Sequence, residues 1–164
     1  MLKIVQKDNK VLRQVAKEIS PEEISSAKIK NIIKNMREAL FASENGVALA
    51  APQIGELIRL FIVSIPEINK DGKKTRQDPP FVFINPKIKK ISRKKNILEE
   101  GCLSIEKTFG KTKRAEKLTI EAYDENGKKF IRGASGLLAQ IIQQETDHLN
   151  VILFIDHAIG YEKQ

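Results

Sequence analysis

The stretch QQETDHLN, residues 143–150, contains side chains whose types and spacing are typical of a metal-binding helix. The common pattern is H-E-x-x-H, in which two histidines four positions apart bind a metal and the glutamate serves as a base. Glu145 and His148 match the end of this pattern, but Gln144 occupies the first histidine position. Residues four apart share a helix face, so Gln144 and His148 are expected side by side. A helix end that reaches solvent is the other interpretation.

A second stretch, LEEGCLSI at 98–105, holds the single cysteine of the sequence, Cys102. A thiolate combined with an imidazole from a helix suits a mononuclear zinc or ferrous site. A lone cysteine is more often a small buried apolar residue, so this stretch alone leaves both interpretations open. One cysteine excludes an internal disulfide and fits a reducing, cytoplasmic compartment.

A third stretch, GVALAAPQIG at 46–55, combines small residues with an amide side chain. Small residues allow another chain to approach the backbone closely, and Gln53 offers an N–H donor that can hold an oxyanion. Interpreted as a connection between a helix and a strand, the same stretch needs no functional explanation.

Two principal helices are expected to position these stretches, one near each end of the chain. Apolar residues at helical spacing after Ala27 predict the first, and Ser20 before Pro21 predicts an earlier helix start. The second begins at Ser135 and ends near Leu149, so it carries the QQETDH stretch. The residues expected to be buried along this second helix are Leu137, Leu138, Ile141 and Ile142.

The middle of the sequence predicts strands. The strands at 117–123 and 128–134 flank DENG, which is a strong hairpin signal. The polar segment 66–80 is expected to be an exposed loop. This pattern predicts an α+β fold, with antiparallel strands packed around the C-terminal helix, in one domain spanning 1–164. The other extended segments are expected at 57–65, 80–86, 87–92 and 95–101.

Charge and hydrophobicity limit the function classes. A net charge of +8 can favour nucleic acid, the ribosome or anionic surfaces. The basic residues are scattered, however, and with 5% aromatic residues the sequence has no platform for base stacking, so direct nucleic-acid binding is not expected. No apolar run approaches the ~20 residues that a membrane helix needs, and a signal peptide is not expected either.

Together the three stretches resemble the peptide deformylase family. That family carries G-x-G-x-A-A-P-Q, E-G-C-L-S and Q-H-E-x-D-H in this order, and here they stand as GVALAAPQ, EGCLS and QQETDH. The resemblance runs through nearly the whole chain. It implies hydrolysis of the formyl group from N-formylmethionyl nascent peptides, with Fe²⁺, Zn²⁺ or Ni²⁺ held by one cysteine and two histidines. It also implies a cytoplasmic protein that works in the vicinity of the ribosome.

The resemblance further implies roles for the residues at the centre of the site. Cys102 and His148 would be metal ligands, and Glu145 would be the general base that passes a proton to the leaving amine. Gln53 and the backbone N–H of Leu103 would stabilise the oxyanion on the formyl carbon.

Other residues would hold the substrate or support the site. Backbone groups near Ala48 would pair with an extended peptide, as an added strand does. Glu100 resembles the buried carboxylate of the family, with Arg114 as its salt-bridge partner. The residues that would line the pocket for the methionine side chain are Val47, Leu137 and Ile141.

Gln144 stands where the family has its first ligand histidine. An amide oxygen is a poorer donor than imidazole for zinc or ferrous iron, so metal binding and turnover are expected to be weakened or lost. The other histidine of the chain, His157, is not expected to replace the missing ligand. Two smaller departures are Ala48, at a glycine of the first motif, and Val151, at the glycine that usually ends the last helix.

Three hypotheses therefore remain open. The chain is a metal-dependent deformylase with an altered site, or a catalytically silent homologue that binds peptides without a stable metal. The third is metal-free hydrolysis with Cys102 as nucleophile and His148 as base, which needs a thiolate paired with a base.

Overall fold

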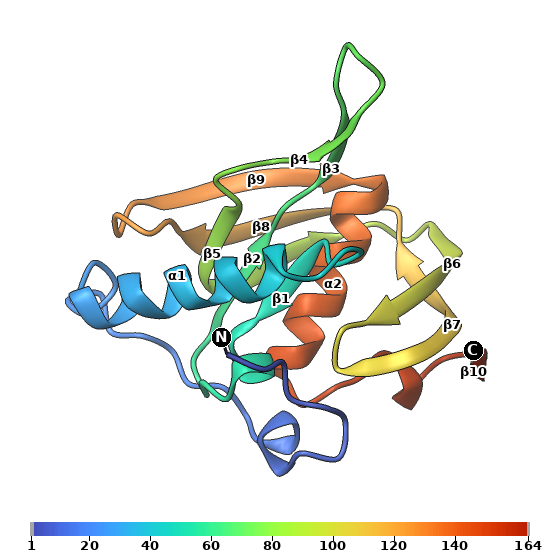
Figure 1. The fold of residues 1–164 in the computed structure, drawn as a ribbon, viewed down its shortest axis with the longest axis horizontal. Helices are drawn as coiled ribbons and strands as arrows, with labels where there is room; N and C mark the ends of the chain where they lie inside the picture. The colour runs from blue at the N-terminus through green and yellow to red at the C-terminus, as the bar shows by residue number, and fades with distance from the viewer. Residues whose placement is uncertain (1, 164) are drawn as a thin grey trace.

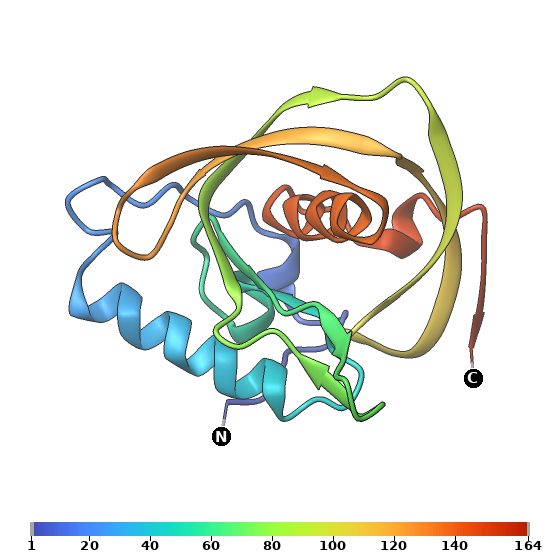
Figure 2. The ribbon, with the colours of Figure 1, turned by 90° about the horizontal axis from the view of Figure 1, so that it is seen from above.

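Helix α2 (Gly136–Leu149) lies in the middle of the molecule, and long strands curve around it (Figures 1 and 2). The computed structural model describes residues 2–163. Its main sheet has five strands in the order β1-β2-β5-β8-β9, and a smaller sheet has the order β10-β7-β6. All paired strands of the two sheets are antiparallel. The predicted α+β class, with antiparallel strands around a C-terminal helix, is confirmed.

The bounds of the elements follow the chain. The helices besides α2 are α1 (Ala27–Phe41) and the 3-10 turns Lys10–Arg13, Ala51–Ile54 and Phe154–Asp156. The strands are β1 (Ala48–Ala50), β2 (Leu60–Val63), β3 (Pro66–Ile68), β4 (Lys74–Arg76), β5 (Phe81–Ile91), β6 (Lys95–Cys102), β7 (Ile105–Ala115), β8 (Lys117–Tyr123), β9 (Lys129–Ser135) and β10 (Gly160–Lys163).

The two faces of the main sheet bury different helices. In β2, Leu60 and Ile62 belong to a core cluster with the apolar stripe of α1, whereas Phe61 and Val63 belong to a cluster with α2. Successive strand residues point to opposite faces, so four consecutive apolar residues serve both cores. Phe61 also stacks on Phe83 of β5, with ring centroids 4.8 Å apart. The sheet is therefore sandwiched between the two helices.

Strands β5 to β8 form one long antiparallel hairpin that arches over α2 (Figure 2). β5 pairs with β8 and β6 pairs with β7, and between them the strands are interrupted only at residues 92–94 and at Glu116. The tip lies at residues 103–104, directly after Cys102. The arch therefore brings the cysteine to α2.

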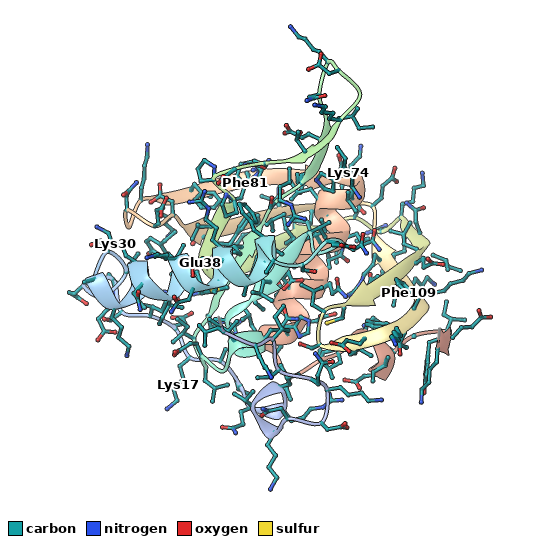
Figure 3. All side chains as sticks on the ribbon, in the orientation of Figure 1. Lys17, Lys30, Glu38, Lys74, Phe81 and Phe109 are labelled. Atoms are coloured by element: carbon teal, nitrogen blue, oxygen red, sulfur yellow. The ribbon has the colours of Figure 1, made fainter. Side chains whose placement is uncertain are left out.

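Two expectations about elements were wrong. Ser20 does not begin a helix, because Ser26 caps α1 and its side chain accepts a hydrogen bond from the Ile29 N–H. The segment 66–80 is not a plain loop but contains the β3–β4 hairpin, which projects from the molecule near Lys74 (Figures 1 and 3). Within residues 2–163, neither long helix has the length and apolar character needed to cross a membrane.

Candidate functional site

A cleft of about 820 Å³ opens where the three sequence stretches meet. The loop before β1 contributes Val47, and the hairpin tip contributes Cys102 and Leu103. α2 contributes Gln144 and Glu145. Figure 3 places Phe109, another residue of the cleft wall, on the side of β6 and β7. Residues that are about 45 and 90 positions apart in the sequence therefore share one site.

Cys102 and His148 lie within contact distance at the floor of this cleft. The Cys102 Sγ atom is 3.3 Å from His148 Nε2. Burial lowers the pKa of His148 to about 4, and the charge of Arg114 lowers it further, so the imidazole is neutral at pH 7. Burial raises the pKa of the Cys102 thiol to about 12, with a contribution from Glu145. Without a cation, the pair therefore consists of a thiol and a neutral imidazole.

Glu145 is almost completely buried, with 4% of its surface exposed. Burial raises the pKa of this carboxyl to about 8, and the nearby charge of Glu100 raises it too. Within the described residues, Glu145 Oε2 and His148 Nδ1 have no hydrogen-bond partner. Buried polar atoms are rarely left unpaired, so this part of the cleft is suited to a polar ligand or water.

The Gln53 side chain is held in one orientation. Its Oε1 accepts a hydrogen bond from the Ala50 N–H at 2.9 Å, which directs the NH₂ group into the site. That NH₂ lies 3.1 Å from Ser104 Oγ and 3.5 Å from Cys102 Sγ. The chain thus presents a fixed amide donor beside the cysteine.

Gln144 reaches across to the strand that carries the cysteine. Its Nε2 donates a hydrogen bond to the Gly101 carbonyl at 2.9 Å. Because a carbonyl can only accept, the NH₂ group must face Gly101, and Oε1 is the atom that Gln144 offers to a cation. Across residues 2–163, no three His, Cys, Asp or Glu side chains converge as a metal site.

Arg114 ties the two halves of the site together from behind. Its guanidinium donates to both Glu100 carboxylate oxygens, at 2.6 and 2.7 Å, and to Asp147 at 2.7 Å. The predicted pairing of Glu100 with Arg114 is therefore present. His157 Nε2 lies 3.6 Å from Asp147, in keeping with the expectation that it does not replace a ligand.

The structure places the proposed methionine pocket only in part. Val47 and Ala48 line the cleft, but among the described residues its lining does not include Leu137 or Ile141. Leu137 is 51% exposed, so the expectation that it is buried was wrong, because the first turn of α2 lies at the surface. Ile141 is buried in the core cluster on the α2 side of the sheet.

The sequence analysis missed the N-terminal segment and two residues of α2. The Val5 N–H donates to the Gln53 carbonyl, and the Lys7 N–H donates to the Ser104 carbonyl, each at 2.8 Å. On α2, Gln140 and Asp147 bond to β6 and Arg114. Asp147 belongs to the E-x-D-H pattern and could have been found there, whereas the segment before residue 8 carries no such signal.

Comparisons with known proteins agree on one family. A sequence profile described as polypeptide deformylase matches residues 1–164. A peptide deformylase of Rhizobium meliloti is 40% identical over 147 residues, which cover 90% of this chain and 79% of that protein.

Solved structures lead to the same family. A peptide deformylase of Synechococcus elongatus in complex with actinonin has a TM-score of 0.84 and 34% identity, covering 97% of this chain and 79% of that one. A class I type b peptide deformylase of Acinetobacter baumannii bound to Met-Ala-Ser has a TM-score of 0.85 and 29% identity, covering 96% of this chain and 98% of that one. Profile, sequence and fold together show that this chain belongs to the polypeptide deformylase family.

Proposed function

We propose that this chain, as one domain spanning 1–164, binds N-formylmethionyl peptides in the cleft and hydrolyses them slowly or not at all. The family is metal-dependent and acts on N-formylmethionyl peptides. The observation that carries the proposal is the hydrogen bond from Gln144 to Gly101 at the position where a third ligand is needed. Its supposed cellular setting is the cytoplasm, close to ribosomes that release nascent peptides.

The cleft supports the binding of a formyl-peptide. β1 is an edge strand of the main sheet, so an extended peptide can pair with it near Ala48. The Gln53 NH₂ group and the Leu103 N–H would hold the formyl oxygen and stabilise negative charge on it. Val47 would contact the methionine side chain. The bound Met-Ala-Ser of the Acinetobacter baumannii protein is a peptide of the kind expected here.

Glu145 is the residue that would move a proton. Its raised pKa, about 8, leaves part of the population ionised at neutral pH, and burial keeps the carboxyl away from bulk water. It would accept a proton from the attacking water and pass it to the amine that leaves as the formyl carbon–nitrogen bond breaks. This role needs no charged partner on the substrate.

The donor set fits the metal of the family only in part. Catalytic zinc and ferrous sites commonly use three protein ligands, and the metal would supply Lewis acidity and an acidic water. Cys102 and His148 offer sulfur and nitrogen, but Gln144 offers a neutral amide oxygen. Two strong ligands and one poor one do not complete the site, and this deficit is the reason for proposing reduced turnover with Fe²⁺, Zn²⁺ or Ni²⁺.

The alternative is a silent homologue that captures peptides without a stable metal, and the same donor set supports it. Metal-free hydrolysis by Cys102 has less support. Burial raises the pKa of its thiol to about 12, and the neutral His148 has a pKa lowered to about 4. A thiolate at neutral pH is therefore strongly disfavoured.

The test compares the natural chain with Gln144→His in metal content and in hydrolysis of formyl-Met-Ala-Ser. Each protein is loaded with Fe²⁺ without oxygen, or with Zn²⁺ or Ni²⁺. We expect Gln144→His to bind one metal per chain and to raise kcat/KM by at least ~100-fold, beyond the usual effect of changes around a ligand. Equal activity and equal metal content in the two proteins would contradict the proposal.

Two further measurements separate the alternatives. If formyl-Met-Ala-Ser binds to the natural chain and is not hydrolysed, the silent homologue is correct. In the Gln144→His background, Glu145→Ala should abolish hydrolysis and leave the metal content unchanged, since Glu145 acts on protons and is not a ligand. Loss of metal would refute its assignment as the base.

A further inference from the structure

The helix and the strand that frame the site are joined by three side chains of α2 at four-residue intervals. Gln140 Nε2 donates to the Glu99 carbonyl at 2.9 Å, and Gln144 Nε2 donates to the Gly101 carbonyl at 2.9 Å. One turn further along, His148 meets Cys102. We name these three contacts the helix–strand zipper.

The spacing of the zipper follows from the dimensions of the two elements. Four helical residues rise about 6.0 Å, and two strand residues rise about 6.6 Å. Gln140 and Gln144 therefore stay in register with Glu99 and Gly101. A glutamine side chain is long enough to span the gap, and its NH₂ group donates to a backbone carbonyl of β6.

We infer that Gln144 is a positioning residue that holds the Cys102 strand against α2 without any metal. In a deformylase with one cysteine and two histidine ligands, the metal itself would link β6 to α2. Here the amide bonds of Gln144 and Gln140 link the same two elements, so the cleft keeps its shape as a metal-independent peptide site. The inference rests on the proposed loss of a metal ligand, and it adds what replaces that ligand structurally.

Other contacts across the interface allow the role of Gln144 to be isolated. Gln143 lies on the same helix but bonds to both backbone groups of Ala115 on β7, at 2.9 and 3.0 Å. It therefore fastens α2 to a different strand. Gln14 is exposed and has no side-chain hydrogen bond among the described residues, so it serves as a surface control. All four residues are glutamines, so each change removes the same chemical group.

The single cysteine of the sequence supplies a direct readout. Because Cys102 is the one thiol, its rate of modification by a thiol reagent under native conditions reports how often the hairpin tip opens. The experiment compares Gln144→Ala, Gln140→Ala, Gln143→Ala and Gln14→Ala with the natural full-length chain. Thermal unfolding and thiol modification are measured with and without EDTA, and with added Zn²⁺.

We expect EDTA and Zn²⁺ to leave the Tm and the labelling rate of the natural chain unchanged. Gln144→Ala and Gln140→Ala should each speed Cys102 labelling by roughly tenfold, the effect of losing one partly buried hydrogen bond. Gln143→Ala should lower Tm by about 3 °C and leave the labelling rate close to that of the natural chain. Gln14→Ala should change neither quantity.

Two results would overturn the inference. One is a fall in the Tm of the natural chain with EDTA as large as that caused by Gln144→Ala. The other is labelling of Gln143→Ala as fast as that of Gln144→Ala, which would show general loosening. If Gln144→Ala does not fold, Gln140→Ala decides the outcome. Efficient hydrolysis of formyl-Met-Ala-Ser by the natural chain would refute the proposed function but leave the labelling result intact.

Discussion

Glu145 is a carboxyl group that the fold keeps away from water without giving it a positively charged partner of its own. The nearby guanidinium of Arg114 is already bonded to Glu100 and Asp147. Holding Glu145 in its charged form therefore costs free energy, and burial raises its pKa from 4.5 to about 8. The residue is poised to exchange a proton near neutral pH, at the expense of stability.

This cost predicts a specific pH dependence for Glu145→Gln. Between pH 4.5 and 8 the folded chain binds the Glu145 proton more tightly than the unfolded chain does, so its free energy of unfolding falls as pH rises through this window. The neutral amide avoids that loss. We expect the variant to match the natural chain near pH 4.5 and to exceed its stability at pH 8 by a few kcal/mol, because each tenfold difference in proton affinity corresponds to about 1.4 kcal/mol.

Urea unfolding at several pH values measures the effect, and exposed Glu22→Gln is the control. The contribution of His148 has the opposite sign. Its pKa is lowered to about 4, so it favours the folded state as pH rises from 4 to 6.5. Because this contribution is common to both proteins, it cancels in their difference. Stability curves that stay parallel for Glu145→Gln and the natural chain would show that burial does not shift the pKa of this carboxyl.

At the residue scale, the sequence located most of the site but not its details. The motifs brought Cys102, His148 and Glu145 into one place because each motif names side chains, and side chains carry the chemistry. The bond from Gln144 to Gly101 was not predictable, because a backbone carbonyl has no sequence signature. For the same reason, the donors of the N-terminal segment to the carbonyls of Gln53 and Ser104 escaped notice.

At the element scale, α2 ends in a conformation that its sequence disfavours. The Ile152 N–H bonds to the Asp147 carbonyl and the Val151 N–H bonds to the His148 carbonyl, which is a Schellman motif. Such an end needs a left-handed residue, and Val151 has φ +71°. A β-branched side chain is strained there, so the departure noted in the sequence is absorbed as local strain, and the helix end keeps its usual form.

The strain predicts that Val151→Gly stabilises the chain. Glycine adopts the left-handed conformation without cost, and the expected gain is about 1 kcal/mol, or roughly 2–4 °C in Tm. Differential scanning calorimetry measures the change. Val151→Ala retains a Cβ and should recover less than half of the gain. A glycine variant that melts no higher than the natural chain would mean that packing of the valine side chain offsets the strain.

Element prediction from the sequence succeeded where apolar spacing was clear and failed where it was not. The extended segments, the DENG hairpin and the course of α2 follow from periodicity and turn residues. β7 was missed because its inward-facing positions hold Thr108, Gly110, Thr112 and Arg114, none of which is a large apolar residue. A strand that buries polar and small side chains shows no apolar alternation, although its pairing with β6 is complete.

At the scale of the whole molecule, Arg114 joins three elements in a buried ionic cluster. It lies on β7, Glu100 on β6 and Asp147 on α2, and the Arg114 and Glu100 side chains are 6% and 1% exposed. Burial of charge is costly, and the cluster is stable because each oxygen of Glu100 receives a guanidinium N–H. These bonds fix the distance between the strand of Cys102 and the helix of His148.

Removing the cation should therefore affect the entire fold. We expect Arg114→Met to lower the free energy of unfolding by about 3–5 kcal/mol, because Glu100 is left as a buried charge without a partner. Chemical denaturation checks the value. The double variant Arg114→Met, Glu100→Gln should recover part of the loss. The exposed pair Lys94–Glu116 is the comparison, and Lys94→Met should cost less than about 1 kcal/mol. Equal losses at the two pairs would contradict the assigned importance of burial.

The arch of β5 to β8 makes the reach of Cys102 a matter of strand length. Each added residue pair would carry the thiol about 3.3 Å further along the arch, and a slip by one residue would turn it to the outer surface. The interruptions at residues 92–94 and Glu116 are the places where the curve of this ribbon is set. Shortening or extending either arm would act on the chemistry as a wrongly cut ruler does on a measurement, with every side chain of the cleft unchanged.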